Sequence, residues 1–80
     1  MKWDGIDIKD NKTYLLKWNE RTKKYDKTLL ANRPIVNIYT TDGKYIGIMD
    51  EGRLIATERI VKAEIDYDCN LCVTIIVDSV

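Results

Sequence analysis

The stretch 35–50, IVNIYTTDGKYIGIMD, decides the fold of this chain. Two runs rich in Ile, Val and Tyr flank the dipeptide Asp42-Gly43, which suits a tight type I′ turn because both central residues of that turn need a positive φ. Residues 35–50 therefore predict a β-hairpin with a two-residue loop, which we call the central hairpin. The rest of the chain is interpreted from it.

The cross-strand pairs of the central hairpin follow by counting outward from the loop. The predicted pairs are Thr41–Lys44, Thr40–Tyr45, Tyr39–Ile46, Ile38–Gly47, Asn37–Ile48 and Val36–Met49. One face then carries Ile35, Tyr39, Ile46 and Ile48, and the other carries Val36, Ile38, Tyr45 and Met49. Because neither face is polar, we expect both to be covered, either by the chain's own barrel or by a partner.

Residues 13–18 (TYLLKW) and 25–30 (YDKTLL) predict two further strands, joined by a polar loop (NERTKK). A short helix over 26–31 is the competing interpretation, because Asp26 could cap its first turn. We favour the strand, because Pro34 keeps the residue before it out of the helical region and would end such a helix after barely one turn.

The segment 61–77 predicts a third hairpin, in which apolar and polar residues alternate on both sides of Asp68-Cys69-Asn70. A three-residue loop there pairs apolar residues with one another, whereas a two-residue loop would set them against polar ones. The predicted pairs are Tyr67–Leu71, Ile65–Val73, Ala63–Ile75 and Val61–Val77.

For two segments outside the hairpins, the sequence pattern indicates the secondary structure less clearly. Residues 1–12 contain a short alternating run that predicts a brief edge strand before a turn at 10–12, and residues 53–59 fit either a short strand or one helical turn. Three successive hairpins without a long helix predict an all-β fold, either a small antiparallel meander or a bent, SH3-like barrel. We expect a single domain over residues 1–80, formed as a small barrel or a strongly bent sheet that removes exposed edges.

Composition narrows the function classes. The 80 residues are 45% hydrophobic and 32% charged, as in an ordinary folded globular domain. The chain has no histidine, Ser79 is its only serine, and its glycines are scattered, which removes Ser-His and Cys-His nucleophiles, His-ligated metals and a phosphate-binding loop. We therefore expect no enzymatic activity, no catalytic residue, no cofactor and no metal. With neither a signal-peptide core nor an apolar run of about 20 residues, the expected compartment is the cytoplasm.

A basic, aromatic stretch is the first candidate site. Residues 9–27 carry seven positive and three negative side chains, with aromatic residues interleaved. Such a hairpin could track a nucleic-acid backbone and stack bases. The residues for single-stranded nucleic acid would be Trp18, Arg21, Lys23, Lys24 and Tyr25. The competing interpretation, supported by the chain's net charge of zero, is that the aromatics are core and the lysines a solvated loop.

The C-terminal part of the chain offers two weaker candidates. Residues 50–80 carry seven negative and three positive side chains, a balance that could steer a protein partner or favour self-association. Cys69 and Cys72 form a CxxC motif, but a closed zinc site needs four ligands, which would take two chains. We therefore expect free thiols, since no secretion signal is present.

Two resemblances bear on this reading. The central hairpin is similar to the first motif of Sm-like and SH3-like barrels, where an Asp-Gly turn leads into an apolar strand containing a glycine; Asp42, Gly43 and Gly47 take those places. The glycine spacing is one residue short of the Sm pattern and no second Sm motif follows, so this resemblance implies a small bent barrel and no ligand-binding residues.

The second resemblance covers residues 60–77 (IVKAEIDYDCNLCVTIIV), in which a strand enters an Asp-rich turn and returns as a Val-Thr-Ile strand. This pattern resembles one in small uncharacterised proteins of phages and prophages of low-GC bacteria. It implies an accessory protein that binds a host or phage partner in the host cytoplasm.

These observations favour a non-enzymatic protein-binding module, such as a phage-encoded accessory protein or inhibitor that docks on a host or phage protein. A homo-oligomer is one form that such binding could take, and no membrane partner is expected. The interface residues would be Tyr39, Tyr45, Ile46, Ile48 and Met49. The alternative is a small β-barrel that binds single-stranded nucleic acid through the basic stretch.

Overall fold

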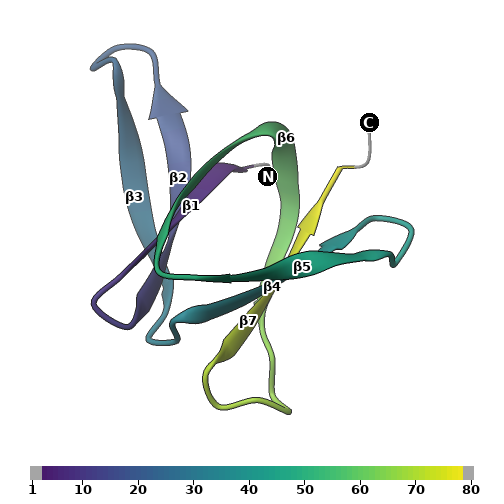
Figure 1. The fold of residues 1–80 in the computed structure, drawn as a ribbon. Coiled ribbons are helices and arrows are strands. Elements are labelled where there is room, and N and C mark those ends of the chain that lie inside the picture. The colour runs from purple at the N-terminus through teal and green to yellow at the C-terminus, as the bar shows by residue number, and fades with distance from the viewer. Residues whose placement is uncertain (1–2, 79–80) are drawn as a thin grey trace.

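The computed structural model describes residues 3–78, except for the side chains of residues 54–59, and it confirms the all-β fold. Residues 3–78 form seven strands in a single sheet of order β3-β2-β1-β6-β7-β4-β5 (Figure 1). The strands are β1 (Trp3–Lys9), β2 (Lys12–Asn19), β3 (Lys24–Ala31), β4 (Ile35–Thr40), β5 (Tyr45–Asp50), β6 (Gly52–Ile65) and β7 (Cys72–Val77). The strand preferred over a helix at 26–31 is confirmed.

β6 joins the two halves of the sheet. Its first part pairs with β1 from Gly52 to Ile60, and its second part pairs with β7 from Ile60 to Ile65. The undecided segment 53–59 is thus part of one long strand, which curves across the molecule in Figure 1. The expected N-terminal strand is present as β1, but its predicted edge position is wrong, because β1 lies in the sheet interior between β2 and β6.

The edges and the strand directions differ from a simple closed meander. β4 runs parallel to β7, whereas the other pairs formed by the described strands are antiparallel. Within residues 3–78 the sheet is bent but open, and β3 and β5 are its edge strands. Of the two expected forms the structure has the bent sheet and not the closed barrel, and the expectation that exposed edges are removed is wrong. Both the β2–β3 hairpin and the central hairpin, now β4–β5, end the sheet.

A type I′ turn does occur, but at a different place from the predicted one. Asp10 and Asn11 both have positive φ, at 55° and 61°, and join β1 to β2 as a two-residue loop. In the central hairpin only Gly43 has positive φ, at 88°. There the Thr40 N–H donates to the Lys44 carbonyl at 2.9 Å, so the loop has three residues and the predicted type I′ turn is wrong.

This longer turn changes the register next to it. The pairs Val36–Met49, Asn37–Ile48 and Ile38–Gly47 are as predicted. A bulge then sets Tyr39 opposite Tyr45, so the predicted Tyr39–Ile46 and Thr40–Tyr45 pairs are wrong, as is Thr41–Lys44. Because a bulge places two residues of one strand against one of the other, it re-aims the side chains beyond it. The Tyr39 and Tyr45 rings consequently lie on the same face, 5.3 Å apart.

The third hairpin follows the prediction only in its middle. Ile65–Val73 and Ala63–Ile75 pair as predicted, but a bulge sets Ile60 rather than Val61 opposite Val77. Tyr67 and Leu71 lie in the loop, outside the β6–β7 ladder, so their predicted pairing is also wrong. The Asp66 N–H donates to the Cys72 carbonyl, which closes a loop longer than three residues.

The core lies on the inner side of the bend and draws on both halves of the sheet. Its buried members are Ile6, Ile8, Leu15, Ala31, Val36, Ile60, Val73, Ile75 and Val77. The alternation of apolar and polar residues along the strands places these side chains on one face. Thr13 is also fully buried, and its hydroxyl donates to the Arg33 carbonyl in the β3–β4 connection. The described residues 3–78 contain no helix that is long and apolar enough to cross a membrane.

Candidate interaction surfaces

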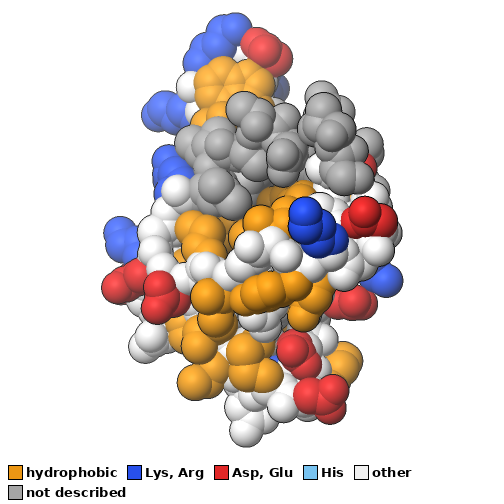
Figure 2. All heavy atoms as spheres, turned by 45° about the vertical axis from the view of Figure 1, so that its right-hand side comes forward, with side chains coloured by type: hydrophobic (Ala, Val, Ile, Leu, Met, Phe, Trp, Pro, Cys, Tyr) orange, Lys and Arg blue, Asp and Glu red, His pale blue; other side chains and the backbone are white. Residues whose placement is uncertain are grey.

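The β4–β5 hairpin exposes large apolar side chains at one edge of the sheet. In β5, Tyr45 is 50% exposed, Ile46 52% and Ile48 63%. Tyr39 is half-buried, and its ring contacts that of Tyr45. We call these four residues, Tyr39, Tyr45, Ile46 and Ile48, the edge surface. Figure 2 turns this hairpin toward the viewer and shows hydrophobic side chains in a band across that face.

Met49 is the one predicted interface residue that does not belong to the edge surface. It pairs with Val36, which is fully buried, and it packs against the core from the inner side of the sheet. The alternation of side chains along β5 thus divides the strand, with Ile48 outward and Met49 inward. Of the two covers expected for this hairpin, the chain's own fold does not cover Tyr45, Ile46 and Ile48, and cover by a partner stays a prediction.

The backbone edge of β5 has few of the features that protect an edge strand. β5 contains neither lysine nor proline, whereas the opposite edge strand, β3, carries Lys24 and Lys27. Gly47 pairs with Ile38, and a Cβ at Gly47 would meet nothing within 4 Å. The bulge beside Ile46 is the main irregularity of β5. This edge is therefore accessible to another strand.

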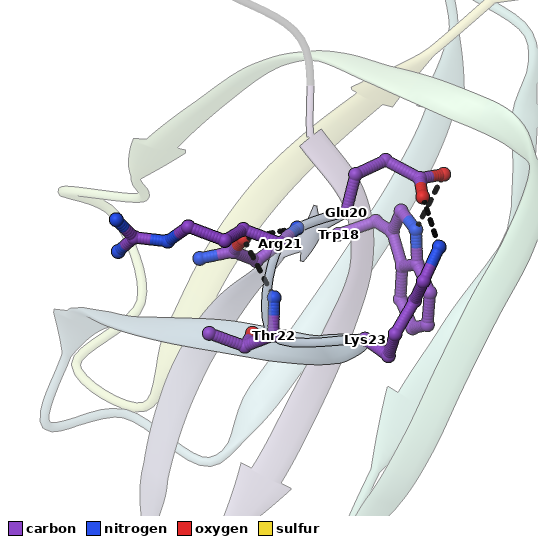
Figure 3. A network of polar contacts seen from close by, with 6 residues as sticks. Trp18, Glu20, Arg21, Thr22 and Lys23 are labelled. Atoms are coloured by element: carbon purple, nitrogen blue, oxygen red, sulfur yellow. Dashed lines mark hydrogen bonds and ion pairs between the residues drawn. The ribbon is translucent and has the colours of Figure 1, made fainter.

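The β2–β3 tip carries the predicted nucleic-acid residues. Figure 3 shows three of them, Trp18, Arg21 and Lys23, with the Arg21 side chain pointing away from the other two. Asn19 organises the loop: its Oδ1 accepts the N–H groups of Arg21 and Thr22 at 3.0 and 3.3 Å, and its carbonyl accepts the Lys23 N–H at 2.8 Å. Lys23 has φ 58°, which completes the turn into β3. The tip is thus an ordered loop that holds basic side chains in the solvent.

Glu20 offsets part of the basic character of this tip. Its carboxylate lies 2.7 Å from the Lys23 Nζ and accepts the Trp18 Nε1–H at 3.0 Å (Figure 3). The Lys23 ammonium and then the indole hold the pKa of Glu20 below its ordinary value. Trp18 is 38% exposed and packs edge-on against Tyr25, with the ring centroids 5.0 Å apart. The indole edge and one lysine are therefore already engaged within the chain.

Sequence reasoning missed a buried ionic contact on β1. The Asp7 carboxylate lies 2.8 Å from the Lys27 Nζ and 3.1 Å from an Arg53 guanidinium nitrogen, although the Asp7 side chain is only 10% exposed. The hydrogen bond from Lys27, opposed by burial and reinforced by Arg53, lowers the pKa of Asp7. This contact ties β1 to β3 and β6. The only signal in the sequence is a charged residue between Ile6 and Ile8.

The CxxC loop is built differently from the prediction. Cys69 and Cys72 form a disulfide, so the expected free thiols are wrong and neither sulfur is a thiolate for zinc. Arg33 Nη1 donates to the carbonyls of Asp66, Cys69 and Cys72 at 2.6, 2.7 and 3.2 Å. Arg33 therefore fixes this loop against the β3–β4 connection. Among the described side chains, no three His, Cys, Asp or Glu residues lie together as a metal site would need.

A pocket of about 390 Å³ lies beside the end of β5. It is lined by Asn11, Pro34, Ile35, Asp50 and Glu51. Its polar groups are two carboxylates and one amide, set beside apolar Pro34 and Ile35.

Comparison with protein-family models, curated proteins and solved structures gives no match for this chain. The two end hairpins, β2–β3 and β4–β5, are therefore the features of the molecule that bear on its function.

Proposed function

We propose that this chain is a non-enzymatic protein-binding module that docks on another protein through the edge surface of β4–β5. The observation that carries the proposal is the exposure of Tyr45, Ile46 and Ile48, each by half or more, on a strand at the edge of the sheet. A phage-encoded accessory protein or inhibitor that docks on a host or phage protein would use such a surface.

Physical chemistry favours this use of the edge. Covering the exposed half of an isoleucine contributes on the order of 1 kcal/mol, and tyrosine supplies a large contact area with a polar end. An extended segment of a partner can also hydrogen-bond to an edge strand and place alternate side chains over the exposed ones. The β4–β5 hairpin offers both features on one strand.

Site-specific photo-cross-linking tests the proposal. A photoreactive phenylalanine analogue placed at Tyr45 should cross-link a different protein in cells that produce the chain, whereas the same analogue at Leu29 should not. Leu29 is the matched control because it is 50% exposed on the opposite edge strand, β3. Ile48→Lys should abolish the cross-link at Tyr45, and Leu29→Lys should leave it intact. Equal products from both positions, or none from Tyr45, would contradict the proposal.

The second candidate is binding of single-stranded nucleic acid at the β2–β3 tip. It is favoured by the Trp18–Tyr25 ring pair and by the exposed Arg21 and Lys24 of the same hairpin. Glu20 opposes it, because its carboxylate engages both Trp18 and Lys23.

Tryptophan fluorescence tests this second candidate. Titration with single-stranded oligonucleotides should quench the signal of Trp18, and the affinity should fall as salt rises. Glu20→Gln should tighten binding several-fold, because it releases Lys23, and Trp18→Phe should remove the quenched signal. The absence of quenching at low salt would exclude this function.

A further inference from the structure

We propose that the loop between β6 and β7 is a thiol–disulfide exchange site, in which the Cys69–Cys72 disulfide opens and closes while the sheet stays folded. Its substrates are thiols of low molecular weight, which can reach a half-buried sulfur more readily than a cysteine on another protein can. The loop projects from the lower end of the molecule in Figure 1. This site is separate from the edge surface, so the inference goes beyond the proposed function and does not depend on it.

The disulfide is not what holds this part of the sheet together. Only Asn70 and Leu71 lie between the two cysteines, so the bond restricts the unfolded chain less than a cross-link between distant segments would. The pairing of β7 with β6 and with β4 is made by the backbone and does not use the sulfur atoms. Opening the disulfide should therefore leave the sheet in place, as a reversible site requires.

Arg33 keeps the two cysteines close in either redox state. Its Nη1 donates to the carbonyls of Asp66, Cys69 and Cys72, and none of these hydrogen bonds involves sulfur. The Cys72 N–H also donates to the Cys69 carbonyl, and the two Cα atoms lie 5.3 Å apart. Because groups held together react as if at a high local concentration, the reduced loop remains prepared to form the disulfide again.

The two sulfurs differ in their access to solvent. Cys69 is half-buried in the loop, whereas Cys72 is the first residue of β7 and is only 7% exposed. An incoming thiolate should therefore attack the Sγ of Cys69, which forms a mixed disulfide there and breaks the bond to Cys72. The Cys72 sulfur leaves as a thiolate, and the Arg33 guanidinium, which binds the Cys72 carbonyl, favours that negative charge.

The complete exchange consumes two thiols. The second thiolate attacks the small-molecule sulfur of the mixed disulfide, which releases the Cys69 sulfur and produces the disulfide of the small molecule. The chain gains two electrons and two protons, and the two thiols lose them. The reverse reaction begins with attack of the Cys69 thiolate on that disulfide, so the thiols and their disulfide are the only reductant and oxidant needed.

The first test is a redox titration of the unmodified chain with mixtures of reduced and oxidised dithiothreitol. Alkylation and mass spectrometry should show both cysteines passing reversibly between disulfide and dithiol, and circular dichroism should show the same sheet at both ends of the titration. A disulfide that is reduced only after urea unfolds the chain, or a sheet that is lost on reduction, would make this bond a structural cross-link and overturn the proposal. A chain that stays a dithiol in the oxidised buffer would also overturn it.

Single-cysteine variants test which sulfur is attacked. Cys72→Ser leaves Cys69 as the only thiol, and Cys69→Ser leaves Cys72. With oxidised glutathione, Cys72→Ser should form the mixed disulfide at least about tenfold faster than Cys69→Ser, because the sulfur of Cys69 is more accessible. Circular dichroism checks that both variants fold. Equal rates, or a faster reaction of Cys69→Ser, would contradict the assignment of Cys69.

Arg33→Lys tests what holds the cysteines together. The variant keeps the positive charge but loses the guanidinium that binds the three carbonyls. Its equilibrium constant for disulfide formation against dithiothreitol should fall several-fold, because the two thiols are held less closely. Arg21→Lys, at an exposed position on the β2–β3 tip, is the matched control and should leave the constant unchanged. An unchanged constant in a folded Arg33→Lys variant would exclude this role of Arg33.

Discussion

Asp7 shows how strongly one residue can be constrained in a small sheet. Its carboxylate is almost fully covered, and two cations from different strands, Lys27 and Arg53, contact it. Both cations remain partly exposed to solvent, which screens their attraction to the carboxylate. The contact therefore serves more to hold β3 and β6 in place across β1 than to supply a large net free energy.

The Asp7→Asn variant measures this contribution. The variant should lose about 1–2 kcal/mol of unfolding free energy at pH 7, because Lys27 and Arg53 lose their charged acceptor. The pKa of Asp7 is lowered in the folded chain, so its stabilisation is present above the ordinary carboxyl pKa and is lost as the pH falls below about 4. Urea unfolding at pH 7 and pH 3 checks the sign of this effect.

The control for this prediction is Asp26→Asn, which changes an exposed carboxylate on β3. That variant should differ from the unmodified chain by less than about 0.5 kcal/mol. A difference for Asp7→Asn that is as large at pH 3 as at pH 7 would show that its charge is not what stabilises the fold.

At the scale of the element, the two glycines of the β4–β5 hairpin look alike in the sequence but differ in backbone conformation. Gly43 and Gly47 both have open space where a Cβ would lie, but only Gly43 has a positive φ, at 88°. A side chain is therefore strained at Gly43 by the backbone alone, whereas at Gly47 the strand conformation suits any residue.

The pair Gly43→Ala and Gly47→Ala tests this distinction. Gly43→Ala should lower the free energy of unfolding by about 1–2 kcal/mol, because alanine resists the left-handed region. Gly47→Ala should be neutral or stabilise by up to about 1 kcal/mol, because it restricts the unfolded chain at a compatible site. Thermal unfolding of the two variants side by side provides the measurement. Equal losses at both positions would contradict the three-residue turn.

The hairpins also show what the sequence can and cannot predict. Alternating apolar residues identified β2–β3, β4–β5 and β6–β7, because a strand with one buried face needs that period. The bulges near Tyr39 and Ile60 were not predictable, because an extra residue leaves the composition of the strand unchanged. Each bulge moved one apolar pair by one position, which is why the pairs beyond it were wrong.

The long-range contacts were even less predictable from the sequence than the bulges. The parallel β4–β7 pair and the salt bridges of Asp7 join segments far apart in the chain, and no local pattern records such partners. The candidate surface was predictable in part. Excess apolar residues on the central hairpin pointed to Tyr45, Ile46 and Ile48, whereas the inward direction of Met49 depends on which face the core occupies.

At the scale of the whole molecule, β6 decides whether the domain unfolds as one unit. The chain measures 39 × 31 × 19 Å, and its two half-sheets share this single strand. Ile60 stands at the junction: it pairs with Trp3 of β1 and with Val77 of β7, and it is fully buried. Since the core contains residues from both half-sheets, loss of packing at Ile60 should destabilise both of them.

The Ile60→Ala variant should therefore destabilise the entire sheet. Removing its buried side chain should cost about 2–5 kcal/mol, a large share of the roughly 5–15 kcal/mol that stabilises a small domain. Amide hydrogen exchange at Leu15 in β2 and at Val36 in β4 should accelerate together, because both residues belong to the same core. Leu29→Ala, at an exposed position on β3, is the control and should change neither rate appreciably. If exchange accelerated in only one half, β6 would be a linker between two separately folding sheets.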